Sequence, residues 1–525
     1  MLISRKHKRI ILRSRDPSSI IAAIPNAKSF IHNGKEFLAV RHGVDEVKVL
    51  ANMGIAVPGP IGYYYAWPGQ YAPMSHQKEI AEFLTHNNRA FNLSDIGTGK
   101  TLATLWALDY LRSVGIVNRA LVVSPLSTLE RTWADELFTH FPNLTCSVVY
   151  GSGDKRRKML SADADVYLVN HDGIKVRGIV DALAKRPDIN LIIVDEIAQV
   201  GRTAGTMRFK ALLKILNRQS PRLCWGITGT PTPNAPTDAW AQCRLLVPDR
   251  VSPYYNRFKM EVMRKVTQYI WVPKPNANAI VQEAMQPAIR FHRDDCIDLP
   301  PCMFETRSVE LTAPQKKAYK DMLIKLTTQV DAGEITAANE AIKAQKLIQI
   351  ASGAVYGEDG ETRYIDAAPR LNVVHEIIQE AQTKVIVFVP FVSAVELVAA
   401  DLRERGHTVE VIYGAVKKTD RDQIFSAFTH DENPKVLVAQ PGTMSHGLTL
   451  TSASTIIWYA PIASADIYEQ ANGRIVRISQ KHSQLIVNIE GTEIERRYYK
   501  RLQDKQKVQG LLLDAIRDAR LALAA

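Results

Sequence analysis

The stretch "NLSDIGTGKTLATLW", from Asn92 to Trp106, places two glycines directly before a segment of helical composition. In a phosphate-binding loop, G-x-x-x-x-G-K-[ST], glycines let backbone N–H groups turn onto phosphate oxygens at the N-terminus of the next helix. Gly97 and Gly99 occupy the tight part of this turn, whereas Ser94 stands where the first glycine is expected. Two interpretations follow: a nucleotide site, or a glycine turn with a chance Lys-Thr pair.

The stretch "NLIIVDE" (190–196) favours the nucleotide site, because its apolar residues end in two adjacent acids about a hundred residues after the glycine turn. Parallel α/β sheets hold ligands at the carboxyl ends of their strands. Lys100 would reach the β- and γ-phosphates, Thr101 and Asp195 would hold Mg²⁺, and Glu196 would orient and deprotonate the attacking water. Acids at a strand end also occur in solvated loops, but their combination with G-x-G-K-T predicts a site for ATP and Mg²⁺.

Short β-branched runs alternate with helical segments along most of the chain, which is typical of parallel sheets flanked by helices. The runs are nearly continuous in apolar character, so both faces of each sheet should be covered. We therefore predict an α/β fold with two lobes. The strands of the first lobe are expected in 119–125, 165–170, 190–196 and 223–231, and those of the second in 384–391, 408–414, 435–442, 455–461 and 484–491.

Composition shifts divide the chain into four parts. A small N-terminal domain, 1–69, has strand and turn signals in 24–43 and a short helix signal in 44–54, and it ends in a Pro/Gly-rich boundary, 57–73. The first lobe then spans 70–250, a linker and helical segment 251–370, and the second lobe 371–525.

The 525 residues carry a formal net charge of +12, which suits a polyanionic partner but also a merely soluble basic protein. The five cysteines are scattered and form no C-x-x-C pair, which argues for reduced thiols, no zinc site and a cytosolic setting. The longest stretch without Asp, Glu, Lys or Arg, 436–465, is rich in Ser, Thr, Gly and Pro, so we expect no membrane helix. These features predict a cytoplasmic protein, in the host cytoplasm if a phage encodes it.

Three further stretches carry a family resemblance: "WGITGTPTPNAP" (225–236), "QPGTMSHGLTLTSAS" (440–454) and "QANGRIVRISQ" (470–480). From residue 71 onward the chain resembles the superfamily-two helicases, specifically the Swi/Snf-like branch of double-stranded DNA translocases, of a compact bacterial or phage type. "SDIGTGKT" is similar to the family form D-x-x-G-x-G-K-T, which does not require a glycine at Ser94. The resemblance implies two RecA-like lobes.

The resemblance also implies roles for individual residues. Lys100, Glu196, Arg474 and Arg477 are expected to be catalytic, and Thr228 to Pro231 match the T-G-T-P coupling motif. Thr101 and Asp195 are expected to bind Mg²⁺. The nucleotide is expected to contact Gln77, which resembles the adenine-recognising glutamine, and Asp95, Gly97, Thr98, Gly99, Lys100, Thr101, Asp195 and Gly447.

Two features leave the coupling of the lobes open. Arg474 and Arg477 lie three residues apart, on one face if the segment is helical, and in the family they face the phosphates of the first lobe. Without the other motifs they would fit a basic helix face. Ala198 stands where the family has a histidine that couples the acidic motif to T-G-T-P, so coupling would use Gln199 or be looser.

These observations predict a DNA-dependent ATPase that translocates on duplex, forked or branched DNA as a monomer, without a membrane partner. Candidate DNA contacts are Ser124, Asn170, Thr443 and His446, and Trp133 belongs to a neighbouring family motif. Two rival functions stay open: a motor that acts on RNA or displaces RNA polymerase, and an ATP-dependent DNA clamp without translocation.

The N-terminal domain also leaves two interpretations. Its basic residues (Arg5, Lys6, Lys8, Arg9) and aromatic cluster (Tyr63, Tyr64, Tyr65, Trp67) could contact DNA by phosphate binding and stacking, and so direct the protein to forks. Alternatively the basic side chains form a solvated face, and the aromatic rings pack on the first lobe.

Overall fold

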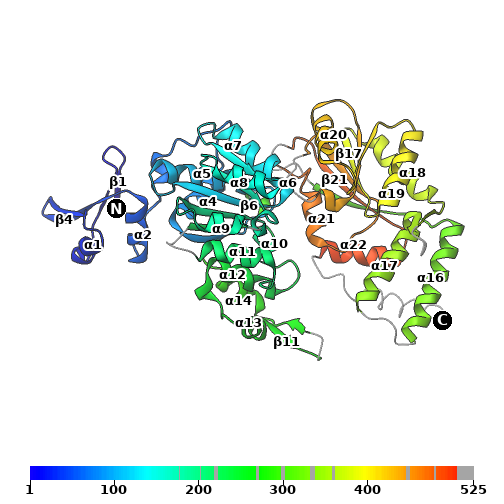
Figure 1. The fold of residues 1–525 in the computed structure, drawn as a ribbon, viewed down its shortest axis with the longest axis horizontal. Helices are drawn as coiled ribbons and strands as arrows, with labels where there is room; N and C mark the ends of the chain where they lie inside the picture. Colours follow the sequence, from blue (N-terminus) through cyan, green and yellow to red (C-terminus); the bar gives the residue numbers. More distant parts are fainter. Residues whose placement is uncertain are drawn as a thin grey trace. The chain divides into compact units, whose positions relative to one another are not determined.

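The chain folds into two compact units, residues 1–296 and 297–525 (Figure 1). The structure is a computed structural model. It describes residues 1–176, 178–201, 203–217, 223–267, 271–296, 302–331, 337–356, 361–444, 450–477 and 480–504. None of the helices in these ranges combines the length and the apolar character needed to cross a bilayer.

The first unit is built on a parallel sheet with two covered faces. Along β6, Leu121 and Val123 point into one apolar core and Ala120 and Val122 into another, which confirms the two-sided burial predicted from the sequence. The strand order is β13 (Ala288–Ile289), β5 (Arg89–Asn92), β10 (Leu223–Ile227), β9 (Ile189–Asp195), β6 (Arg119–Ser124), β8 (Val166–Asn170) and β7 (Cys146–Val149).

Helices on each face of this sheet bury their apolar stripes in these two cores. One face holds α4 (Ser75–His86), α5 (Lys100–Ser113) and α7 (Asp135–His140). The other holds α8 (Gly153–Ser161), α9 (Ile179–Ala184), α10 (Ile197–Val200), α11 (Met207–Leu216), α12 (Ala239–Leu246), α13 (Tyr255–Val262) and α14 (Ala277–Ala284), while β11 (Met263–Lys265) and β12 (Trp271–Pro273) form a small hairpin.

The second unit repeats this layout. On β17, Val385 and Val387 face one core and Ile386 and Phe388 the other. The parallel strand order is β14 (Cys302–Ser308), β21 (Gln484–Glu490), β20 (Ala453–Trp458), β17 (Lys384–Phe388), β19 (Val436–Ala439) and β18 (Val409–Ile412). The helices are α16 (Ala313–Asp331), α17 (Ala337–Ser352), α18 (Ala368–Glu380), α19 (Val392–Glu404), α20 (Lys418–His430), α21 (Ala465–Asn472) and α22 (Glu493–Gln503). Two RecA-like lobes are thereby confirmed.

The segment between the lobes adds an edge strand to each sheet, which the sequence patterns did not indicate. β13 pairs in parallel with β5, and β14 pairs in parallel with β21 along seven residue pairs. α17 packs with α22 in a small core of its own, and β15 (Ala354–Tyr356) pairs with β16 (Thr362–Tyr364). The middle of the chain therefore completes both sheets in addition to connecting them.

The N-terminal residues form a four-stranded antiparallel sheet in the order β1 (Leu2–Ser4), β2 (Arg9–Leu12), β4 (Lys35–Arg41) and β3 (Lys28–His32). Two helices, α1 (Pro17–Ala23) and α2 (Val44–Asn52), accompany it, so the strand, turn and helix signals read in 24–54 are confirmed. Ile10, Leu12, Leu38 and Val40 make the apolar core of this sheet.

A buried ion pair holds α18 and α22 together in the second lobe. Arg370 donates through Nη2 to both carboxylate oxygens of Glu495, at 2.8 and 3.0 Å, and both side chains are almost fully buried. Glu495 also accepts hydrogen bonds from the Gly491 N–H and the Thr492 hydroxyl. Removing one partner leaves a buried charge without compensation.

Replacing Glu495 with glutamine is therefore expected to destabilise the second lobe by about 3–5 kcal/mol, the usual cost of breaking a buried pair. Arg496→Gln is the matched control, because Arg496 lies next along α22, is about half exposed and pairs with Glu490 and Glu493 at the surface. Its expected effect is below about 1 kcal/mol. Urea unfolding of the second lobe measures the loss of unfolding free energy in each variant. Equal losses in Glu495→Gln and Arg496→Gln would contradict a stabilising role of the buried pair.

Candidate nucleotide site

The phosphate-binding loop connects β5 to α5 and has the backbone conformation that its glycines predict. Gly97 and Gly99 have φ angles of 91° and 72°, in the left-handed region that L-residues with a side chain rarely adopt. A Cβ atom on Gly99 would lie 2.1 Å from the Gln77 side-chain amide. The backbone angle therefore favours glycine at 99, and a side chain there would also displace the Gln77 amide.

Lys100 and Gln77 both turn toward this loop. The Lys100 ammonium donates to the backbone carbonyls of Ser94 and Asp95, at 2.6 and 2.8 Å. The Gln77 amide group reaches the Gly99 carbonyl at 3.5 Å, while its oxygen accepts from the Met74 N–H. Thr98 donates its hydroxyl to the Asp95 carbonyl, and Thr101 lies in the first turn of α5. The structure thus gathers the predicted loop residues around one turn.

The two acids at the end of β9 have different surroundings. Asp195 accepts a hydrogen bond from the Trp133 indole N–H at 3.0 Å, where a π-helical turn (Leu129–Ala134) directs the indole to the strand end. Burial raises the pKa of the Asp195 carboxyl, while the Trp133 hydrogen bond and the positive charge of Lys100 oppose the rise. Glu196 follows in a left-handed conformation, φ 48° and ψ 51°. Such backbone strain in a residue other than glycine is typical of functional sites.

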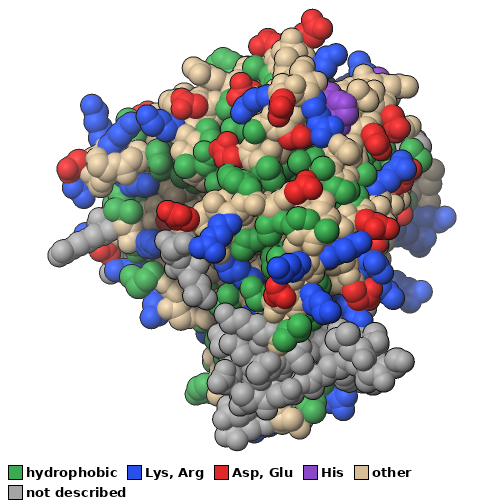
Figure 2. Space-filling model, turned by 90° about the vertical axis from the view of Figure 1, so that its right-hand side faces the viewer, with side chains coloured by type: hydrophobic (Ala, Val, Ile, Leu, Met, Phe, Trp, Pro, Cys, Tyr) green, Lys and Arg blue, Asp and Glu red, His purple; other side chains and the backbone are tan. Residues whose placement is uncertain are grey.

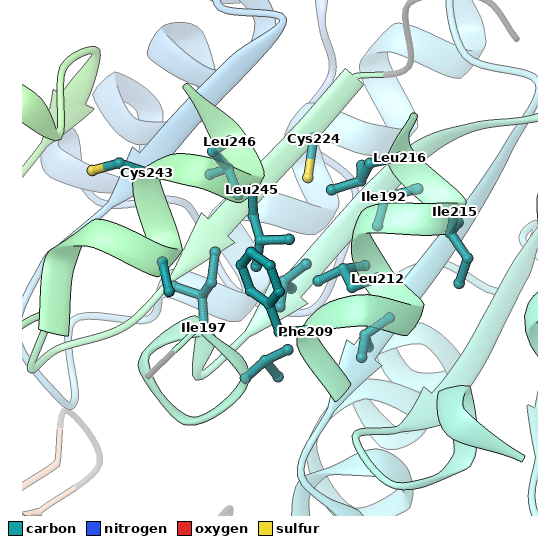
Figure 3. Close-up of a cluster of buried hydrophobic side chains, with 14 of the residues drawn as sticks. Ile192, Ile197, Phe209, Leu212, Ile215, Leu216, Cys224, Cys243, Leu245 and Leu246 are labelled. Atoms are coloured by element: carbon teal, nitrogen blue, oxygen red, sulfur yellow. The ribbon is translucent and has the colours of Figure 1, made fainter. Parts of the chain in front are cut away.

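An apolar anchor holds Glu196 in this strained conformation. Ile197 begins α10 and points into the core between α11 and α12, beside Phe209 and Leu246 (Figure 3). A Cβ atom on Gly226 would lie 2.8 Å from Ile197 and 2.9 Å from Leu246. The glycine of "WGITGTP" therefore allows Ile197 to pack against β10, which fixes the residue next to Glu196.

The acidic motif contacts the T-G-T-P motif directly. The Thr228 hydroxyl donates to Glu196 Oε2 at 3.3 Å and accepts from the Thr230 N–H at 3.2 Å. Ala198 is buried, and Gln199, the residue suggested for coupling, has an exposed side chain. In this structure Thr228 therefore links the two motifs directly, although the sequence lacks the usual histidine.

Comparisons with known proteins agree with this geometry. Residues 76–354 match the SNF2-related domain, and this match covers more than half of the chain. The chain belongs to the SNF2-related family. Residues 369–479 of this SNF2-related protein also match the helicase conserved C-terminal domain. The predicted membership of the Swi/Snf-like superfamily-two helicases is confirmed, and these domains are those of ATP-binding ATPases and helicases.

Relatives of this SNF2-related protein include phage and eukaryotic sequences. Protein p41 of Acyrthosiphon pisum secondary endosymbiont phage 1 is 27% identical over 474 residues, which cover 85% of this chain and 99% of p41. The ISWI chromatin-remodeling complex ATPase ISW1 of Saccharomyces cerevisiae is 24% identical, over 85% of this chain but 41% of its own length. Among solved structures, S. cerevisiae Dbp5 bound to RNA and ADP BeF3 shares the fold, with a TM-score of 0.50, 12% identity and coverage of 88% and 93% of the two chains.

The structure of the SNF2-related protein adds residues that the motifs did not single out. His171 follows β8, and its Nε2 lies 2.8 Å from the Asp195 carbonyl oxygen, so the end of β8, on the far side of β6 in the sheet, also supports the acidic motif. The Ser94 hydroxyl accepts from the Phe291 N–H at 3.1 Å, and the Asp95 N–H donates to the Phe291 carbonyl at 3.0 Å. Ser94, the departure from the general pattern, thus attaches the continuation of β13 to the phosphate-binding loop. The one sequence signal that could have identified His171 is its position as a polar residue at the end of a strand.

The predicted DNA contacts lie in different surroundings. Ser124 and Asn170 are paired in register at the ends of β6 and β8, but both side chains are buried, and Asn170 accepts a hydrogen bond from Arg156 at 3.1 Å. The Thr443 hydroxyl donates to the Gln440 carbonyl. His446 and Gly447 lie outside the described residues. DNA binding by Ser124, Asn170, Thr443 and His446 stays a prediction, and so does the nucleotide contact of Gly447.

The two arginines of the second lobe do not share a helix. α21 ends at Asn472, and Arg474 and Arg477 follow in a turn and a bend, so the argument from a common helical face does not apply. Arg474 is buried, and Arg477 is half-buried and donates through Nε to the Gly473 carbonyl at 2.9 Å.

The aromatic cluster before the first lobe is largely packed. Tyr65 donates its hydroxyl to Asp109 on α5, and the Trp67 ring meets the Trp106 ring edge-on. Arg5 and Lys8 lie over the rings of Tyr63 and Tyr64, at 5.1 and 5.3 Å. The structure therefore favours the packed interpretation of this cluster over the stacking one.

Proposed function

We propose that this SNF2-related protein is an ATP-dependent DNA translocase that hydrolyses ATP and remodels duplex, forked or branched DNA. The observation that supports it most is the convergence of Lys100, Asp195, Glu196 and Thr228 at one edge of the first sheet. Roles in DNA repair, recombination or replication would follow from such an activity.

Each of these side chains has a proposed role in ATP hydrolysis. Gln77 contacts the adenine, the N–H groups of the glycine loop and the Lys100 ammonium bind the phosphates, and Glu196 accepts a proton from the attacking water. Thr228 holds the Glu196 carboxylate in place. Arg474 and Arg477 then add positive charge to the developing negative charge on the phosphates, as arginine fingers do.

Magnesium fits the donor set at this site. The Asp195 carboxylate and the Thr101 hydroxyl are hard oxygen ligands of the kind that Mg²⁺ selects. The buried carboxyl of Asp195 has a raised pKa, so a cation beside it would stabilise its charged form. When bound, Mg²⁺ neutralises part of the phosphate charge.

DNA is the proposed polyanion for two reasons. The relative ISW1 belongs to a chromatin-remodeling complex, and the formal net charge of +12 suits contacts along a phosphate backbone. A motor that acts on RNA stays an alternative, because Dbp5, a protein of the same fold, is bound to RNA in its solved structure. The clamp alternative is favoured by Ala198 but opposed by the direct contact between Thr228 and Glu196.

Stimulation of ATP hydrolysis by different nucleic acids tests this proposal. We expect duplex DNA to stimulate turnover more strongly than single-stranded DNA or RNA, since the proposed motor tracks both strands of a duplex. Forked and linear duplexes of equal length would then show whether branched DNA is preferred. Stimulation by RNA alone would rule out duplex translocation.

Displacement of a triplex-forming strand separates translocation from clamping. A translocase removes the third strand at the expense of ATP, whereas a clamp hydrolyses ATP and leaves the triplex intact. Hydrolysis stimulated by duplex DNA without displacement would therefore favour the clamp.

A further inference from the structure

The N-terminal sheet has one covered and one open face. Ile10 and Leu12 on β2 and Leu38 and Val40 on β4 are buried against α1 and α2. Side chains of alternate residues point to opposite faces of a strand, so the residues between these four lie on the other face. Both Ile11 and Ala39 there are only half-buried.

The open face gathers basic and aromatic side chains. The strand register sets out its members, which are Leu2, Ser4, Arg9, Ile11, Lys28, Phe30, His32, Lys35, Phe37, Ala39 and Arg41. Within β1–β4 the one acidic residue is Glu36. It lies between Lys35 and Phe37 in β4, so it belongs to the opposite face of the sheet. Every formal charge that these strands contribute to the open face is therefore positive.

Two phenylalanines form an exposed stack within this basic surface. Phe30 and Phe37 are directly paired across β3 and β4, with ring centroids 5.9 Å apart and planes at 25°. Phe30 is 39% exposed, although a large aromatic side chain normally buries most of its surface in a core. An accessible aromatic surface on a sheet, flanked by cations, is the arrangement on which unpaired bases stack.

The charge of the protein is concentrated in this region. Residues 1–56 contain ten Lys and Arg but four Asp and Glu, so about a tenth of the chain carries half of the net charge of +12. By contrast, the face drawn in Figure 2 intersperses Lys and Arg with Asp and Glu, with no predominance of one sign. The local excess favours a polyanion as the occupant of the open face.

We propose that the open face of β1–β4 binds single-stranded DNA, with bases stacked on Phe30 and Phe37 and phosphates held by Lys28, Lys35, Arg9 and Arg41. A duplex hides the faces of its bases, so the exposed ring stack selects a single strand. The preference for DNA over RNA rests on the proposed function, whereas the preference for a single strand rests on the sheet alone. The site differs from the packed cluster Tyr63 to Trp67.

Binding to the full chain without nucleotide tests the aromatic stack. Fluorescence anisotropy with a labelled oligothymidylate of about ten nucleotides covers the usual footprint of one such site. The double variant Phe30→Ala, Phe37→Ala is expected to weaken this binding by on the order of tenfold or more. Ile31→Ala is the matched control, since Ile31 lies next to Phe30 on β3 and is 78% exposed but belongs to the opposite face of the sheet. Its affinity should equal that of the unmodified protein.

Two further measurements keep the proposal testable if the double variant folds poorly. Phe30→Tyr with Phe37→Tyr preserves the rings and should preserve binding. Lys28→Gln and Lys35→Gln should each lower the slope of log affinity against log salt by about 0.7, the value for one lost contact to a single strand. An oligonucleotide with a photoreactive base should crosslink within residues 28–41.

Several outcomes would overturn the assignment. The first two are unchanged single-strand binding in the Phe30, Phe37 double variant, and a loss of this binding in Ile31→Ala as large as that in the double variant. The other two are a loss of duplex binding in the double variant as large as its loss of single-strand binding, and tighter binding of single-stranded RNA than of single-stranded DNA by the unmodified protein. Duplex-stimulated ATP hydrolysis should be unaffected by the double variant, because the rings lie outside the nucleotide site. If DNA did not stimulate hydrolysis by the unmodified protein, the translocase proposal would be contradicted. If the double variant nevertheless lost single-strand binding, the proposed single-strand site on the open face would be supported.

Discussion

Glu196→Gln is expected to reduce ATP turnover by about a hundred- to ten-thousandfold, the range over which a general base contributes to rate. Glutamine preserves the shape of the side chain, and its amide oxygen can still accept from the Thr228 hydroxyl, so the surroundings of β9 should persist. What is lost is the ability to accept a proton from water. The turnover number and the dissociation constant of ATP, measured separately, should therefore respond differently: turnover collapses and ATP affinity is retained.

Glu283→Gln provides the control for this substitution. Glu283 is exposed on α14 in the same unit, so its replacement removes one negative charge without touching the nucleotide site. Turnover in Glu283→Gln should match that of the unmodified protein. Substantial turnover in Glu196→Gln would show that another group activates the water.

Lys100→Ala is expected to reduce turnover by about a hundred- to a thousandfold, the usual effect of removing one preorganised donor to developing charge. Unlike Glu196→Gln, it should also weaken ATP binding, because the ammonium contacts phosphates in the ground state as well. In the structure this group bonds the carbonyls of Ser94 and Asp95, so its removal also loosens the loop that must bind the phosphates.

Lys210→Ala tests whether the loss of any lysine charge in the first unit has this effect. Lys210 is exposed on α11, and its replacement should leave ATP affinity and turnover unchanged. If Lys100→Ala retained normal turnover, the phosphates would bind elsewhere, and the assignment of the loop from Ser94 to Gly99 would be wrong.

Sequence patterns predicted most strands of the two sheets, including the edge strand β18, but missed β5, β7, β13 and β14. The run "NLIIVDE" is apolar because β9 lies between two other strands and under helices on both faces. In β14, by contrast, Met303 and Phe304 are each 53% exposed and most other side chains are polar. That strand joins its sheet through backbone hydrogen bonds, which leave no signature in the side-chain pattern.

The site shows the same division between local and distant signals. Gly97, Gly99, Lys100 and the acids 195–196 belong to short motifs whose spacing reflects local geometry, so they could be identified directly. The contacts from Trp133 to Asp195 and from Ser94 to Phe291 join residues 62 and 197 positions apart. Such pairs depend on how the strands are ordered in the sheet, which no single sequence pattern records.

The edge strand β14 has a practical consequence for dissecting the protein into separately expressed halves. The helicase C-terminal match covers residues 369–479, but the sheet it belongs to also needs β21 and β14. A fragment cut at the limits of the match would leave β20, with the apolar Ile456 and Trp458, as a bare edge open to intermolecular pairing. A fragment that is to remain in solution should begin before Cys302 and continue past Glu490, so that the sheet keeps its own border.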